Sequence, residues 1–72
     1  MKVTVIIEKD ADGYYAFCPA LQGCHSQGDS LDEVLANIKE AIELYLETLS
    51  EAEKMRCLNQ NSFAAILEVN VA

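Results

Sequence analysis

A stripe of apolar residues at helical spacing is the feature that most constrains the fold of this 72-residue chain. It consists of Leu31, Val34, Leu35, Ile38, Ala41, Ile42, Tyr45, Leu46 and Leu49. Ser30 and Glu33 just before it have the spacing of a capping box, in which each side chain bonds the other's backbone N–H, so we expect a helix to begin after Ser30. An apolar stripe must be buried, and in so short a chain a sheet has to cover it.

Alternating apolar residues before this helix predict a three-stranded antiparallel meander. Val3, Val5 and Ile7 alternate in a first strand over residues 2–8. The pair Asp12-Gly13 is typical of a tight hairpin turn. A second strand, from Tyr14 to about Cys18, then folds back on the first and ends at Pro19. A short third strand runs from about Cys24 to Gln27.

The end of the chain has the alternation of a further strand, in "FAAILEVNV", residues 63–71. The predicted fold class is therefore α+β in the order β-β-β-α-β. A three-stranded antiparallel meander and a returning fourth strand form the sheet, with one helix packed on it, in a single domain over residues 1–72. The segment 50–62 either extends the helix or starts a second one, because Ser50 and Glu53 repeat the capping spacing.

The charge balance indicates which partners to expect. Twelve Asp and Glu against five Lys and Arg give a formal net charge of −7, which repels nucleic-acid phosphates and attracts basic proteins, although solubility alone also explains such a charge. No apolar run approaches the ~20 residues of a membrane span, and the N-terminal residues reach charge too soon for a signal peptide. We therefore expect a cytoplasmic protein that binds neither membrane nor nucleic acid.

The stretch "FCPALQGCHSQGD", residues 17–29, suggests a metal or thiol site but does not fit one. Structural zinc ligands come in closely spaced pairs, whereas five residues separate Cys18 from Cys24. Cys24 and His25 are adjacent and face opposite sides of a strand, so His25 cannot serve Cys24 as a base, although it could meet Cys18 across the sheet. We expect the cysteines to be small buried residues and Leu21 to lie in the core or in a subunit contact.

The acidic residues near the first turn do not form a metal site either. Glu8, Asp10 and Asp12 fit the start of a calcium-binding EF-hand loop, but its twelfth position, which needs a Glu, is Pro19. Two-metal nuclease chemistry needs several converging acids, and only Glu8 and Asp10 are placed for it. The sequence therefore predicts no catalytic residue, no metal and no cofactor, and a protein that is not an enzyme.

Residues 8–46 resemble the core of the HicB antitoxin family. The matching features are an acidic hairpin, "DGYYA", a C-P-x-L-x-G-C loop, "SQGD" and a helix with "NIKEAIELYL". The resemblance implies a partial RNase H-like fold without a working nuclease centre. It also implies a type II antitoxin that neutralises a small basic HicA-like mRNA-cleaving toxin by covering its RNA-binding and active-site surface.

The acidic residues supply the candidate toxin interface. These are Glu33, Glu40, Glu43 and Glu47 on the outer helix face, with Asp10 and Asp12 at the hairpin. We also expect a homo-oligomer, because exposed strand edges favour self-association. Longer family members append a DNA-binding domain, and we expect none here because the chain ends after its fourth strand. Two alternatives stay open, which are an orphan oligomeric binding module without a toxin and a metal-dependent nuclease using Glu8 and Asp10.

Overall fold

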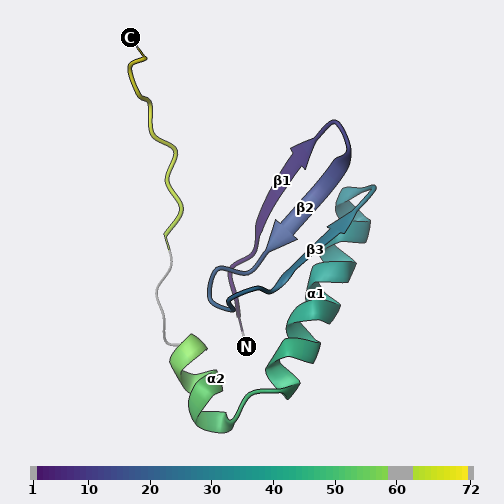
Figure 1. The fold of residues 1–72 in the computed structure, drawn as a ribbon, viewed down its shortest axis with the longest axis vertical. Coiled ribbons are helices and arrows are strands. Elements are labelled where there is room, and N and C mark those ends of the chain that lie inside the picture. The colour runs from purple at the N-terminus through teal and green to yellow at the C-terminus, as the bar shows by residue number, and fades with distance from the viewer. Residues whose placement is uncertain (1, 59–62, 72) are drawn as a thin grey trace.

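A small antiparallel sheet with one long helix across it forms the body of the protein (Figure 1). The computed structural model describes residues 2–58 and 63–71. The elements are β1 (Ile6–Asp10), β2 (Gly13–Phe17), β3 (His25–Gly28), α1 (Leu31–Glu47) and α2 (Glu51–Leu58). The sheet order β1-β2-β3 and the α+β class are as predicted. Neither helix in this part of the chain has the length and apolar character that a membrane span requires.

The strand register places two connections at one end of the sheet. Asp10 pairs with Gly13 across the β1–β2 turn, and Tyr14 pairs with Gly28 at the end of β3. Gly13 has a φ of +134°, which favours glycine, so the predicted hairpin turn is confirmed with Gly13 as its left-handed residue. The β1–β2 turn and the β3–α1 junction therefore lie side by side.

The core lies between the sheet and α1. Because strand side chains alternate, Ala16 on β2 faces the helix and is fully buried, while Tyr15 and Phe17 face the other side. The buried apolar residues are Ala16, Cys18, Leu21, Cys24, Val34, Ile38 and Ile42. Leu21 thus lies in the core, which was one of its two predicted positions.

The loop between β2 and β3 is held by its own backbone. Cys18 N donates to Cys24 O at 3.0 Å, and Cys24 N donates to Leu21 O at 3.0 Å. Gly23 completes the turn with a φ of +79°. These bonds bring both cysteines into the core, as small apolar side chains.

The thiols should react in an order set by this burial. Loss of solvent contact, and secondarily the proximity of Cys18, raise the pKa of the Cys24 thiol above its ordinary value, and Cys18 is buried as well. Cys57 on α2 is partly exposed. We expect iodoacetamide to alkylate Cys57 roughly tenfold or more faster than the other two in the native protein. Mass spectrometry of a time course measures this, and equal labelling of all three cysteines would contradict it.

The helix ends follow the capping signals with one difference. Ser30 Oγ accepts from Glu33 N at 3.1 Å, but the Glu33 carboxylate accepts from Asp29 N instead of Ser30 N. At the second site Ser50 and Glu53 form the full reciprocal box, at 3.2 Å in both directions, so α2 is a new helix. Hydrogen bonding to Ser50 lowers the pKa of the Glu53 carboxyl, first through the Ser50 backbone N–H that donates to Oε1 and second through the Ser50 side chain.

The predicted fourth strand is not confirmed in the single chain. Residues 63–71 belong to no strand, and this segment runs beyond α2, off the sheet (Figure 1). Its alternating pattern is that of a strand, but no other strand of the described residues lies alongside it to pair with its backbone. Its large apolar side chains are almost fully exposed, with Phe63 at 93% and Ile66 at 102% of their maximal area. The 50–62 segment is settled as helix only as far as Leu58, since residues 59–62 lie outside the described part.

Candidate functional site

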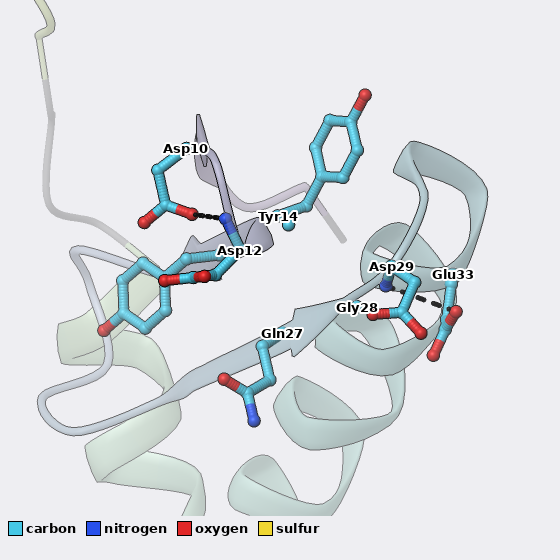
Figure 2. A pocket seen from close by; sticks show the side chains of 9 residues that line it. Asp10, Asp12, Tyr14, Gln27, Gly28, Asp29 and Glu33 are labelled. Atoms are coloured by element: carbon cyan, nitrogen blue, oxygen red, sulfur yellow. Dashed lines mark hydrogen bonds between the residues drawn. The ribbon is translucent and has the colours of Figure 1, made fainter.

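An open hollow of about 650 Å³ lies where the β1–β2 turn meets the β3–α1 junction (Figure 2). We call it the acidic hollow, because four carboxylates line it. Its lining residues are Asp10, Asp12, Gly13, Tyr14, Tyr15, Gln27, Gly28, Asp29 and Glu33. Figure 2 shows Asp10 and Asp12 on one side and Asp29 and Glu33 on the other. The hollow is therefore a direct product of the strand register.

The hairpin side of the hollow is fixed by a local hydrogen bond. Asp12 N donates to Asp10 Oδ1 at 2.8 Å, an arrangement by which an aspartate side chain stabilises a turn two residues on. One oxygen of Asp10 is thus used within the turn. The Asp12 carboxylate is exposed and free of this structural role.

The helix side of the hollow is held to β3 by two contacts. Asp29 N donates to Glu33 Oε2 at 3.3 Å, and Asn37 Nδ2 donates to Gln27 O at 2.9 Å. The absence of a side chain on Gly28 permits this close approach, because a Cβ there would lie 2.7 Å from Val34 N. The first turns of α1 therefore sit directly against the end of β3.

The charge of the hollow is left uncompensated within the described residues. The ion pair found among these residues joins Lys54 Nζ to Glu51 Oε1 at 3.3 Å, and both residues lie on α2, far along the chain from the hollow. The nearest basic residue in sequence, Lys9, has its Nζ 5.8 Å from the centre of the Tyr14 ring, a cation–π contact. Four exposed carboxylates without a basic partner attract cations, most strongly at low ionic strength.

An aromatic patch borders the hollow on the sheet face opposite α1. It consists of Tyr15, Phe17 and His25, which the register places on one side of β2 and β3. The Tyr15 ring stacks on the His25 ring, with the two ring centroids 5.7 Å apart. The centroid of the Tyr15 ring lies 6.0 Å from the centroid of the Phe17 ring. Tyr15 is 41% exposed and also lines the hollow. Carboxylates and aromatic rings therefore lie next to each other on one surface, with Tyr15 belonging to both.

The structure brings together some of the predicted interface residues and separates others. Asp10, Asp12 and Glu33 share the hollow. Glu40, Glu43 and Glu47 are exposed on α1 but do not line it. Sequence reasoning missed Asp29, whose signal was available, since it follows the third strand and directly precedes the helix cap, at the same end of a meander as the first turn.

No metal centre is found in the described part of the chain. Nowhere in residues 2–58 and 63–71 do three His, Cys, Asp or Glu side chains gather closely enough to hold a metal ion. The four carboxylates of the acidic hollow do not form such a group.

The fold and this site define a small acidic α+β domain suited to binding a basic partner. Over residues 3–69 the sequence matches the HicB-like antitoxin of bacterial toxin–antitoxin systems. The chain therefore belongs to this antitoxin family, which assigns it the general role of an antitoxin and implies a toxin partner.

Relatives of this chain occur in bacteria and archaea. It is 50% identical to a UPF0150 protein of Helicobacter pylori over the full length of both chains. It is 64% identical to a UPF0150 protein of Synechocystis over 64% of this chain and 60% of the relative. A UPF0150 protein of Archaeoglobus fulgidus is 56% identical over 74% of this chain and 78% of its own. No solved structure matches the chain significantly.

Proposed function

We propose that this protein is a cytoplasmic type II antitoxin that binds a small basic HicA-like, mRNA-cleaving toxin and covers its RNA-binding and active-site surface. The observation that carries the choice of a basic partner is the acidic hollow with its four uncompensated carboxylates. Family membership supports the antitoxin role itself. The net charge of −7 adds long-range attraction to the same class of partner.

The mechanism is competition for the cations that hold RNA. A toxin that cleaves RNA presents Lys and Arg side chains to phosphates, and carboxylates bind the same side chains in the same way. Asp12, Asp29 and Glu33 are placed to do this around the hollow. Once they are engaged, the bound antitoxin occupies the path that the RNA backbone would take.

Electrostatic attraction alone gives fast encounter and modest affinity. Tight binding needs apolar or aromatic anchors that lose contact with water at the centre of the interface. The aromatic patch supplies them beside the carboxylates, with Tyr15 at the point where the two surfaces meet. In this proposal the protein is a binding scaffold with a degenerate RNase H-like fold, and it acts without catalysis, cofactor or direct contact with nucleic acid.

Inhibition of RNA cleavage tests the proposal. The toxin to be used is the small basic protein encoded beside this gene, assayed on a labelled mRNA with increasing amounts of this protein. We expect complete protection near a stoichiometric ratio, with an association rate that falls steeply as salt is raised, because the attraction is electrostatic. The control is an RNase of unrelated fold, which this protein should leave active.

The opposite outcome is equally clear. Cleavage that continues at a large excess of this protein, or the lack of any such neighbouring protein, would remove the toxin from the proposal. The chain would then be an orphan binding module of the same family.

A further inference from the structure

A second surface is an apolar groove of about 550 Å³ between α1 and the residues that lead into β1, which we call the β1 groove. It is lined by Val3, Val5, Leu35, Ile38, Lys39, Ile42, Glu43 and Leu46. The groove exists because α1 packs mainly on β3 and β2 and leaves the β1 side of the sheet less covered. Leu35 is 42% exposed to solvent although it belongs to the apolar stripe of the helix.

The strand beside this groove is an open edge. In the order β1-β2-β3, β1 pairs only with β2, so the backbone groups on its other side have no strand partner among the described residues. Such an edge is a template for pairing with another extended segment. A segment added here would run along β1 and lie over the groove at the same time.

Residues 63–71, which we call the exchange segment, have the complementary properties. Their alternation places Phe63, Ala65, Leu67, Val69 and Val71 on one face of an extended chain. In the single chain Leu67 is 81% and Val71 is 89% exposed. The opposite face carries Ala64, Ile66, Glu68 and Asn70, so it is polar only in the second half of the segment. Such a segment has neither a strand to pair with its backbone nor a surface to cover its apolar side chains.

We propose that the exchange segment of one copy pairs with the β1 edge of a second copy, with its apolar face in the β1 groove, and that the reciprocal contact closes a twofold dimer. The lengths are compatible, because β1 has five residues and the exchange segment is long enough to pair along all of them. In one chain the segment stands off its own sheet and leaves both surfaces exposed (Figure 1). Two copies that trade segments satisfy both edges and both apolar faces.

The dimer is compatible with partner binding but does not depend on it. The lining of the β1 groove and that of the acidic hollow share no residue. Exchange therefore leaves most of each hollow free, although Asp10 at the end of the paired β1 edge also lines the hollow. A failure of the dimer and a failure of the toxin proposal would accordingly be seen in different measurements, molecular mass in one case and RNA cleavage in the other.

Two point variants of the full chain test the exchange. Leu67→Asp places a charge on the apolar face of the segment, and Leu35→Glu places one in the groove. Both residues are exposed in the single chain, so the fold should be kept, which circular dichroism verifies. Light scattering should give twice the 7.9 kDa chain mass for the wild type. Dimerisation of each variant should be roughly a hundredfold weaker or worse, since the added charge would be buried unpaired. The matched control Asn70→Asp adds the same charge on the opposite face and should remain dimeric.

Mixing the two variants separates exchange between chains from pairing within a chain. Leu35→Glu keeps an intact segment and Leu67→Asp keeps an intact groove, so the mixture can form one correct pairing. We expect a heterodimer to appear on mixing although each variant alone is monomeric. The proposal is overturned by a monomeric wild type or by variants that dimerise like the wild type. It is also overturned by a mixture that stays monomeric, because that result would indicate that the segment pairs with its own sheet.

Discussion

Replacing Asp12 and Asp29 together with lysine should abolish efficient neutralisation of the toxin. We expect the association rate to fall on the order of 10- to 100-fold at low salt, because steering by complementary charge changes such rates by about 10- to 1000-fold. RNA protection should then require a correspondingly larger excess of the antitoxin. Stopped-flow association and the cleavage assay measure the two effects.

These two residues are chosen because the structure uses only their backbone. Asp12 N donates to Asp10 and Asp29 N donates to Glu33, and both bonds survive a change of side chain. Both side chains are exposed. The substitution thus reverses charge on opposite sides of the acidic hollow while the turn and the junction that form it remain. Thermal unfolding of the variant should be close to that of the wild type.

A matched control separates the effect of charge in the acidic hollow from the effect of the net charge of the protein. Glu40→Lys with Glu47→Lys makes the same two reversals on α1, outside the hollow, so both double variants have their net charge changed from −7 to −3. The helix variant should retain most of the association rate. Equal losses in the two variants would mean that only net charge matters, and a loss confined to the helix variant would place the interface on the outer helix face.

The fold could be predicted wherever the signal was local. The apolar stripe and Ser30 located α1, and alternation with Pro19, Gly13 and Gly23 located the three strands and their turns, although the first strand was predicted over residues 2–8 and is found at Ile6–Asp10. The fourth strand could not be located in this way. Alternation shows that residues 63–71 are suited to a strand, but pairing also needs an edge, and a sequence does not state which edge, or which copy of the chain, provides it.

The site could be predicted in part for a similar reason. Helical periodicity grouped Glu33 with Glu40, Glu43 and Glu47 on one helix face, and this grouping concerns a single element. The acidic hollow arises between elements, from a register that sets the first turn beside the start of α1. Asp29 joins Asp10 and Asp12 through that register, and its place at the same end of the predicted meander as the first turn was the signal that a grouping along one helix face overlooked.

The second substitution from which we expect a large effect is Gly28→Ala, at the junction of β3 and α1, and the effect is on stability. A Cβ at this position would meet Val34 N at 2.7 Å and the Glu33 carbonyl carbon at 3.1 Å. Val34 N–H is the donor of the first bond of α1, to Ser30 O at 3.0 Å, so this backbone cannot yield without loosening the helix start. We expect a loss of about 1–3 kcal/mol in the free energy of unfolding, as for overpacked sites. For a domain of this size that lowers the Tm by about 4–8 °C per kcal/mol.

Calorimetry and denaturant titration measure this loss, and Gly23→Asn is the matched control. Gly23 also lies in a connection, but no atom lies within 4 Å of a Cβ there, and asparagine tolerates its φ of +79° better than other residues. The control should therefore unfold close to the wild type. Because α1 must withdraw from β3 in Gly28→Ala, the Asn37 bond to Gln27 O should weaken and the acidic hollow should widen. The variant should then bind the toxin less well with its charge unchanged, and wild-type stability with wild-type binding would show that the junction is not as tightly packed as its geometry indicates.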